Sequence, residues 1–315
     1  MQNIVILQTS WIKKNSNLKV SKNNMDNEFF EKLIESYKLS EDEHRMILNE
    51  LKKRVFFNRV AEKNPSIMFV IGQPGCGKTT FIQNTDLSNY TIINSDDYRC
   101  FSKYSDEILD KYPTYYTKLT NFDAHLWGDE LFSYAIDNSY SALREKAPVD
   151  YSLLEIIRAI PDKYDAIVDL VVTGELASLL ATRERYEKGI LKSKNARLSN
   201  IEAHNKCYCV LPGFISKCLS CGIKVNYIVP RSNGYETISV GNDGLYLLER
   251  LRKESNERVC PDYETRMNNI KRAMINRNAP QEQFDELNKI EKTYLKIVNS
   301  KYVENITPEY TETGR

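Results

Sequence analysis

The fold of this chain is indicated by Ile67-Met68-Phe69-Val70-Ile71 and the residues that follow at once, Gly72-Gln73-Pro74-Gly75-Cys76-Gly77-Lys78-Thr79. The first five residues are all apolar, which is typical of a parallel strand that helices cover on both faces. The next eight match G-x-x-x-x-G-K-[ST], the phosphate-binding P-loop, which joins a strand to a helix. This order predicts an α/β fold with a P-loop NTPase-type parallel sheet flanked by helices.

Each residue type in the loop suits a triphosphate. The glycines permit a tight turn whose backbone N–H groups converge on phosphate oxygens, and the helix N-terminus adds partial positive charge. Lys78 is expected to reach the β- and γ-phosphates, and the Thr79 hydroxyl is expected to ligate Mg²⁺. The alternative is a glycine-rich turn without a ligand. The expected nucleotide-binding residues are Gly72, Gln73, Pro74, Gly75, Cys76, Gly77, Lys78, Thr79 and Thr80.

A pair of acids, Asp96 and Asp97, follows the next apolar run, Tyr90–Ile93. The carboxyl ends of neighbouring parallel strands line one crevice, so an acid there can face the γ-phosphate. It can then take a proton from an acceptor hydroxyl or help to hold Mg²⁺. The alternative is that these acids cap the following turn. Beside a P-loop, the pair favours a small-molecule kinase over a motor-type ATPase.

Strands alternate with helices along the middle of the chain, which predicts right-handed crossovers between parallel strands. Besides the strand at 67–71, strands are expected at 90–94, 140–143, 166–172 and 223–229. Helices are expected around 79–85, 123–137, 151–160, 175–189 and 199–220, and the last of these is expected to be interrupted near Pro212.

We expect the chain to divide into three parts. Residues 1–24 are interpreted as a loose N-terminal extension. Residues 25–230 are interpreted as the kinase domain, which begins with two helices near residues 26 and 41. Residues 231–315 are interpreted as a mostly helical region packed on that domain, after a small hairpin near Asn233–Gly241.

The composition excludes some classes of partner. The 315 residues carry 44 Lys and Arg against 43 Asp and Glu, so a formal net charge of +1 gives no whole-surface attraction for nucleic acid. No run approaches the roughly 20 apolar residues that span a bilayer. We therefore expect a cytoplasmic protein whose partners include neither a membrane nor nucleic acid.

Seven cysteines in this length do not indicate a disulfide framework. Cys207, Cys209, Cys218 and Cys221, with His204 nearby, have spacings that could supply zinc ligands. Cysteine is also a common small core residue, and we interpret the four in that way. His125 and His204 are interpreted as structural.

Basic side chains gather between residues 183 and 197, where the opposing acids are Glu184 and Glu187. Such a segment can fold over a nucleotide as a lid, where arginines neutralise charge on the transferring phosphoryl group. The alternatives are a solvated helix face, or RNA binding, which has little support from interleaved aromatic residues. The basic residues are Arg183, Arg185, Lys188, Lys192, Lys194 and Arg197.

Taken together, these motifs resemble the zeta toxin/PezT family of P-loop kinases. The resemblance covers roughly residues 26–225. It rests on the loop at 72–79, Asn-Ser-Asp-Asp-Tyr-Arg at 94–99, Glu-Arg-Tyr-Glu at 184–187, Asn-Ala-Arg at 195–197 and Glu-Ala-His-Asn at 202–205.

The resemblance implies a Mg²⁺-dependent kinase that transfers the γ-phosphoryl group of ATP or GTP to the 3′-hydroxyl of the sugar in UDP-N-acetylglucosamine. It also implies a product that poisons cell-wall synthesis and a small antitoxin protein that covers the nucleotide site. By motif, Asp96 would be the general base, and Lys78, Arg185 and Arg197 would clamp the phosphoryl group. The expected substrate contacts are Glu130, Asp97, Tyr98 and Glu145.

One motif departs from the family pattern. The family usually has Glu-Gly-Thr closed by a basic residue after its third strand, whereas the corresponding stretch here, Ser141–Pro148, keeps only Glu145. The acceptor is therefore open among UDP-N-acetylglucosamine, another nucleotide sugar, an NAD-type dinucleotide and an RNA end. A nucleotide-binding regulatory protein without catalysis is an alternative of another class.

Overall fold

The computed structural model describes residues 24–112, 115–192, 196, 198–241 and 243–306. The expected extension at 1–24 lies almost wholly outside these residues, and Arg197 of the expected lid also lies outside them. No helix in the described ranges is long and apolar enough to cross a membrane.

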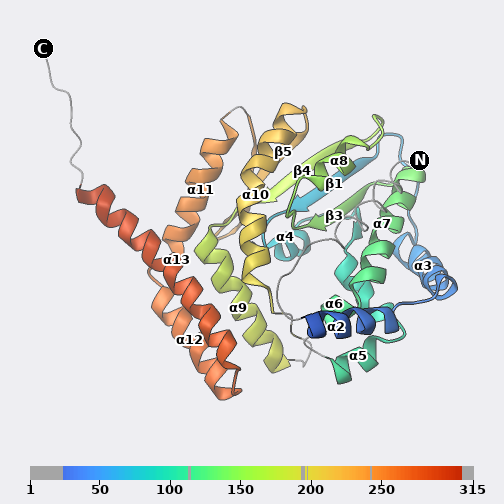
Figure 1. The fold of residues 1–315 in the computed structure, drawn as a ribbon. Coiled ribbons are helices and arrows are strands. Elements are labelled where there is room, and N and C mark those ends of the chain that lie inside the picture. Colours follow the sequence, from blue (N-terminus) through green and yellow to red (C-terminus); the bar gives the residue numbers. More distant parts are fainter. Residues whose placement is uncertain (1–23, 113–114, 193–195, 197, 242, 307–315) are drawn as a thin grey trace, which may run out of the picture.

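A six-stranded sheet lies at the centre of the molecule (Figure 1). Its order is β2-β3-β1-β4-β5-β6, and the first five strands are parallel, which confirms the predicted α/β sheet. The sixth strand lies where the sequence predicted a hairpin; it pairs antiparallel with β5 and extends the sheet past residue 230. The strands are β1 (Ser66–Ile71), β2 (Thr91–Ile93), β3 (Ala142–Lys146), β4 (Asp165–Val171), β5 (Lys224–Arg231) and β6 (Gly234–Ser239).

Helices surround this sheet, and the sequence predicted most of them. The short helices between β2 and α7 were missed, because that segment has no sustained helical spacing of apolar residues. The helices are α2 (Asn24–Ser36), α3 (Glu41–Val55), α4 (Lys78–Asn84), the 3-10 helix η1 (Ser95–Phe101), α5 (Ser105–Lys111), α6 (Tyr116–Leu119), α7 (Asn121–Asp137), α8 (Ser152–Arg158), α9 (Glu175–Lys192), α10 (Ile201–Ser220), α11 (Gly244–Val259), α12 (Tyr263–Asn276) and α13 (Gln281–Ile306).

Strand residues alternate between the two faces of the sheet, and each face has its own core. Phe69 of β1 and Ala142 of β3 point to the main core, which α3, α7, α8 and α10 complete. Val70 and Leu143, one residue further along each strand, point to a smaller core that contains Phe81 of α4. Successive residues of β3 therefore face α7 and α4 in turn.

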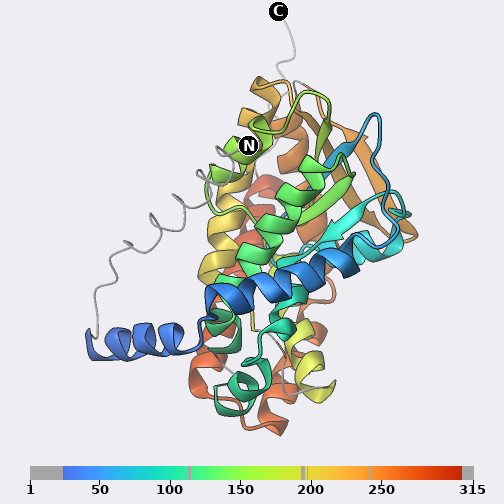
Figure 2. The same cartoon turned by 90° about the vertical axis from the view of Figure 1, so that its right-hand side faces the viewer.

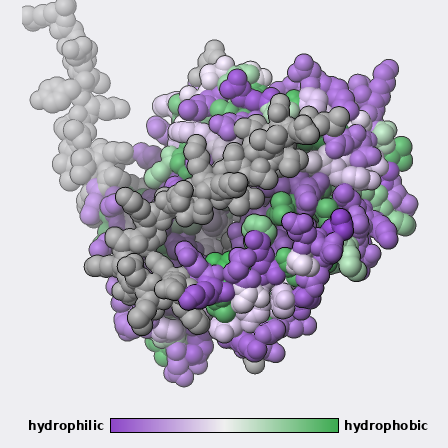
Figure 3. All heavy atoms as spheres, turned by 45° about the vertical axis from the view of Figure 1, so that its right-hand side comes forward, coloured by the Kyte–Doolittle hydropathy of each residue, from purple (hydrophilic) through white to green (hydrophobic). Residues whose placement is uncertain are grey.

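Two further clusters lie outside these cores. Helices α12 and α13 pack on α9 through a cluster that includes Leu179, Met267 and Ile290, and Figure 1 shows these helices side by side. Helix α2 packs on α5 and α6 around Tyr37 and Ile108, away from the sheet (Figure 2). On the face in Figure 3, hydrophobic residues of the described part lie scattered among hydrophilic ones.

Helix α10 runs unbroken through Pro212, so the predicted interruption there is wrong. Proline has no N–H, and the carbonyl of Tyr208, four residues earlier, therefore loses its helical partner. Arg252 of α11 replaces that partner, since its Nη2 donates to the Tyr208 carbonyl at 3.0 Å and its guanidinium lies 3.7 Å from the centre of the Tyr208 ring. The missing hydrogen bond thus comes from another helix.

Replacing Arg252 by Met should lower the free energy of unfolding by about 2 kcal/mol, because the Tyr208 carbonyl is left without its partner. Pro212→Ala restores an N–H at that position, so it should recover part of the loss when the two changes are combined. Urea unfolding of both single variants and the double variant measures this coupling. Strictly additive effects would contradict the compensation.

Candidate active site

The phosphate loop connects β1 to α4 and depends on glycine at its bends. Gly75 has φ of 81°, and a Cβ there would lie 2.2 Å from the carbonyl oxygen of Ser178 on α9. Gly77 has φ of 98° directly before the helix begins. Any other residue would be strained at both positions, so the sequence keeps the loop tight and close to α9.

Buried polar side chains hold the phosphate loop in position through hydrogen bonds. Gln73 is 1% exposed, and its Nε2 donates to the Thr173 carbonyl at 2.8 Å and to Ser178 Oγ at 3.2 Å. Ser178 Oγ also lies 2.8 Å from Nε2 of His204, which is fully buried. The Thr173 hydroxyl donates to the Cys76 carbonyl at 3.0 Å. His204 therefore has a structural position, in line with its interpretation from the sequence.

Lys78 and Thr79 present their polar groups at the start of α4. The Lys78 ammonium is buried and donates to the carbonyls of Gly72 at 2.8 Å and Gln73 at 3.3 Å. The Thr79 hydroxyl is 3.1 Å from Oε2 of Glu145, and Lys78 Nζ is 3.8 Å from Oε1 of the same carboxylate. Glu145 therefore lies on the phosphate-loop side of β3.

Asp96 lies at the carboxyl end of β2, in the first turn of η1. Arg99 holds it, with Nε 2.9 Å and Nη2 2.7 Å from Oδ1 of the carboxylate. The Arg99 side chain is 5% exposed and is itself fixed by the Thr117 carbonyl, Thr120 Oγ1 and Asn121 Oδ1. Arg99 belongs to the motif at 94–99 but was not predicted as a site residue; in the structure it orients Asp96.

The carboxylates at this edge of the sheet lie close enough together to change the pKa of Asp97. Partial burial raises the pKa of Asp97, and the nearby carboxylates of Asp96 and Glu145 raise it further. Glu145 in turn contacts the phosphate loop. The acids that follow β2 and the loop that follows β1 therefore lie at the same edge of the sheet, as expected for parallel strands.

Helix α7 presents two adjacent acids to different neighbours. Glu130 accepts from His44 Nε2 of α3 at 2.7 Å, so its carboxylate is turned toward that helix. Asp129 instead accepts from Arg144 Nη2 at 2.7 Å and lies 3.9 Å from Lys146 Nζ. Burial raises the pKa of Asp129, but the cations of Arg144 and Lys146 outweigh this and lower it.

Burial and the neighbouring Arg144 lower the pKa of Lys146 to about 7, although Asp129 and Asp96 act in the opposite direction. Burial, together with the charges of Lys146 and Arg99, lowers the pKa of His125 to about 4. His125 is therefore neutral at ordinary pH. Arg144 and Lys146 were not predicted as site residues, because the strand was expected to end at Leu143, before these charged residues.

Three charged residues of the expected lid are engaged with the C-terminal helices. Arg183 is buried and pairs with Glu286 of α13 at 2.5 Å. Glu184 accepts bidentate hydrogen bonds from Arg266 of α12, and Glu187 accepts them from Arg277, the residue that follows α12, at distances of 2.6 to 2.8 Å. These acids therefore fix α9 to α12 rather than oppose the basic run.

Arg185, by contrast, is exposed on α9 and donates to Ser199 Oγ at 3.0 Å. Tyr98 is not exposed beside Asp96 and Asp97, because it is 5% exposed and lies in the main core. Cys207 and Cys218 are buried while Cys209 and Cys221 are exposed, so these pairs do not converge. No group of three or more possible metal-binding side chains occurs among the residues the structure describes.

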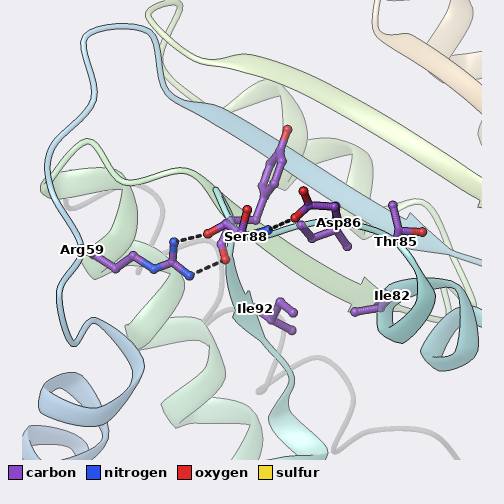
Figure 4. Close-up of a pocket in the computed structure, with 8 residues that line it drawn as sticks. Arg59, Ile82, Thr85, Asp86, Ser88 and Ile92 are labelled. Atoms are coloured by element: carbon purple, nitrogen blue, oxygen red, sulfur yellow. Dashed lines mark hydrogen bonds between the residues drawn. The ribbon is translucent and has the colours of Figure 1, made fainter.

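A separate depression lies beside the start of β2 (Figure 4), with a volume of about 470 Å³. Arg59 donates there to the carbonyls of Ser88 and Tyr90, both at 2.7 Å. These residues precede β2, whereas Asp96 follows it, so the depression lies at the opposite end of the strand from the candidate active site. The Arg59 guanidinium therefore stabilises the turn that precedes β2.

His44 provides a pH-dependent contact between α3 and α7. Its Nδ1 lies 2.9 Å from Oδ1 of Asp123, and its ring stacks on Trp127. Burial alone would lower the pKa of His44, but the hydrogen bonds and charges of Asp123 and Glu130 raise it to about 9. A folded-state pKa above the unfolded value near 6.5 gives stabilisation that is complete below about pH 6.5 and lost as the pH rises through about 9.

The free energy of unfolding should therefore fall by about 2–3 kcal/mol more in the wild type than in His44→Gln between pH 6.5 and pH 9. The Gln side chain keeps a donor to the carboxylates but does not titrate. Lys146 and other groups that titrate in this range are common to both proteins and cancel in the difference. Equal pH slopes in chemical unfolding would show that His44 is not charged in this contact.

Comparisons with known proteins agree with this arrangement. The family model described as Zeta toxin matches residues 49–234, which contain β1 to β5, the phosphate loop and Asp96. A chain of the PezAT chromosomal toxin–antitoxin system of Streptococcus pneumoniae has the same fold, with a TM-score of 0.63 and 20% identity over 74% of this chain and 98% of that chain. No curated protein matches significantly.

Two structures of the AvrRxo1-ORF1:-ORF2 complex align more weakly, each at 11% identity. The native complex has a TM-score of 0.49 over 67% of this chain and 72% of that chain. The complex with ATP has a TM-score of 0.46 over 78% and 84%. With the family match spanning more than half of its length, the chain belongs to the zeta toxin family of P-loop kinases.

Proposed function

We propose that this protein transfers the γ-phosphoryl group of ATP or GTP to a sugar hydroxyl of a nucleotide sugar, and that the acceptor is the 3′-hydroxyl of UDP-N-acetylglucosamine. The observation that carries the proposal is the common edge of the sheet. Lys78 and Thr79 follow β1, Asp96 follows β2, and Glu145 at the end of β3 contacts the phosphate loop. A triphosphate site and a carboxylate are what phosphoryl transfer to a hydroxyl requires.

In this proposal the loop residues Gly72–Thr80 bind the phosphates through backbone N–H groups and the Lys78 ammonium. Arg185 and Arg197 approach the transferring group from the lid side and neutralise its charge. The ion pairs of Glu184 and Glu187 with α12 support this assignment, because they fix α9 and so limit where Arg185 can reach.

Asp96 is proposed as the general base. Its carboxylate takes the proton of the acceptor hydroxyl as that oxygen bonds to the γ-phosphorus, and the bond from the γ-phosphorus to the β–γ bridging oxygen breaks to release the nucleoside diphosphate. Arg99 keeps the carboxylate oriented through its two contacts with Oδ1. Glu130 and Asp97 are proposed to contact the acceptor.

The side chains at the loop fit a magnesium ion. Thr79 supplies a hydroxyl oxygen, Glu145 supplies a carboxylate next to it, and Asp97 adds negative charge nearby. Oxygen ligands of this kind are those that Mg²⁺ prefers. We assign Thr79 and Glu145 to hold the ion, which when bound neutralises charge on the phosphate oxygens.

We further propose that the protein acts in the cytoplasm as the toxin of a toxin–antitoxin pair, with a small antitoxin that covers the nucleotide site. The family match and the likeness to a chain of the PezAT system support this proposal. A different acceptor is the second candidate, favoured by the absence of the Gly-Thr pair after Glu145.

Lys78→Ala should reduce phosphoryl transfer by on the order of 10²-fold or more, because the cation that binds the transferring group is removed. Radiolabelled ATP offered with a panel of nucleotide sugars measures the rate. Asp106→Asn, an exposed change on α5, is the control and should behave as the wild type.

Asp96→Asn should bind ATP as the wild type does and lose turnover by on the order of 10²-fold, because the amide cannot accept the hydroxyl proton. Titration with a non-hydrolysable ATP analogue measures binding, and the same label assay measures turnover. Near-normal turnover would remove Asp96 from the role of base.

Glu145→Gln should raise the Mg²⁺ concentration for half-maximal activity about tenfold, since one anionic oxygen ligand is lost. Glu155→Gln, an exposed change on α8, is the matched control. An unchanged Mg²⁺ dependence would mean that Glu145 does not hold the ion.

A further inference from the structure

Strand β3 carries two cations on the face that looks toward α7. Arg144 and Lys146 are two residues apart and share that face with Ala142 of the main core, whereas Glu145 faces the phosphate loop. One carboxylate, Asp129, lies between the two cations. The positive charges of this strand end therefore outnumber the acid that α7 provides.

The two cations are not equivalent partners of Asp129. Arg144 is 1% exposed, donates to Oδ1 of Asp129 at 2.7 Å and lies over the ring of Phe132. It therefore neutralises the carboxylate and cannot move without breaking the core. Lys146 Nζ is 3.9 Å from the same oxygen, beyond hydrogen-bond distance.

Within the described residues, Asp129 is the one carboxylate within 4 Å of the Lys146 ammonium, and no hydrogen bond to that ammonium is present. The side chain is 24% exposed, so the ammonium is partly accessible to a ligand that enters the site. An ammonium without a hydrogen-bond acceptor in the protein keeps its three donors available to a ligand. His125 beside it is neutral and does not provide a charge.

The position of the Lys146 ammonium limits which part of a substrate can bind to it. Lys146 lies at the carboxyl end of β3, on the side away from Thr79, and close enough to Asp96 that the aspartate raises its pKa. The proposed donor phosphates lie on the Glu145 side of the strand. A group that approaches Asp96 from the α7 side belongs to the acceptor.

We propose that Lys146 is a specificity-determining residue that binds a phosphate group of the acceptor. This inference rests on the proposed function, and it specifies a residue of that site that determines the choice of acceptor. Asp129 and Arg144 position the lysine: Asp129 attracts the ammonium without forming a hydrogen bond, and Arg144 prevents Asp129 from neutralising it. A neutral sugar would leave the ammonium without a partner.

The test compares wild type, Lys146→Met, Lys146→Arg and the exposed control Lys53→Met with saturating ATP. The acceptors are UDP-N-acetylglucosamine, N-acetylglucosamine 1-phosphate and N-acetylglucosamine. Lys146→Met should raise the KM for both phosphorylated acceptors about tenfold or more, with little change in the KM for ATP or in kcat/KM for the neutral sugar. Lys146→Arg should recover most of the loss, because it keeps the charge.

Equal losses on charged and neutral acceptors, or a rise in the KM for ATP alone, would overturn the proposal and make Lys146 a structural or donor-side residue. Thermal unfolding of each variant checks that it folds. Binding of UDP by calorimetry, with the donor site filled by a non-hydrolysable ATP analogue, gives a readout that needs no turnover.

If the wild type phosphorylates none of the three sugars, the proposed acceptor is wrong. The inference about Lys146 is then decided by the UDP titration. About tenfold weaker binding by Lys146→Met supports a phosphate subsite at Lys146, while unchanged binding, or no binding by the wild type, contradicts it.

Discussion

Three parallel strands, β2, β3 and β1, end at one edge of the sheet, and the placement of every candidate active-site residue on them follows from that constraint. β1 delivers the phosphate loop, β2 delivers Asp96, and β3 lies between them in the order of the sheet. Because β3 is the middle strand, its last residues lie between the phosphate loop, which follows β1, and Asp96, which follows β2. Its alternation sends Glu145 toward the loop and Lys146 toward α7.

Buried polar contacts then hold each end of this edge in place. Gln73 joins the loop to the start of α9 through Thr173 and Ser178, while Arg99 joins Asp96 to the segment that leads into α7. Such groups are costly to bury unless they are paired, so each contact fixes one geometry. This rigidity is what orientation of a donor phosphate against an acceptor hydroxyl requires.

The C-terminal helices lie outside the part of the chain that the family model matches, yet they contact the expected lid directly. Arg183, Glu184 and Glu187 are engaged with α12 and α13, and the hydrophobic cluster around Leu179 lies on the same helix. Helices α12 and α13 therefore hold α9 in position. Arg185 is exposed on α9 and is the residue of that helix proposed to act on the nucleotide.

The sequence predicted the parts of the fold that depend on local pattern. The loop at 72–79, the apolar strand before it and the alternation of strands and helices identify the sheet because each has a direct physical cause in its residue types. The unbroken α10 could not be predicted, since the group that compensates Pro212 is Arg252, 40 positions away in the chain and on another helix. The pairing of Glu184 and Glu187 with arginines of the C-terminal region could not be predicted from the sequence for the same reason.

The charged end of β3 was missed for a different reason. Arg144 and Lys146 resemble loop residues when judged by composition, and only the register with β1 and β2 shows that they continue a buried strand. The contacts of the two acids on α7 could not be predicted from the sequence either. Glu130 and Asp129 are adjacent in sequence, but Glu130 contacts His44 of α3 and Asp129 contacts Arg144 of β3.

The central claim is that one crevice holds both the donor phosphates and the acceptor hydroxyl. A crystal structure of the Asp96→Asn protein with a non-hydrolysable ATP analogue and UDP-N-acetylglucosamine tests it most directly. We predict the γ-phosphate beside Lys78 and the acceptor hydroxyl within hydrogen-bond distance of the side chain at position 96. An acceptor bound elsewhere, with residue 96 turned away from the γ-phosphate, would contradict the account.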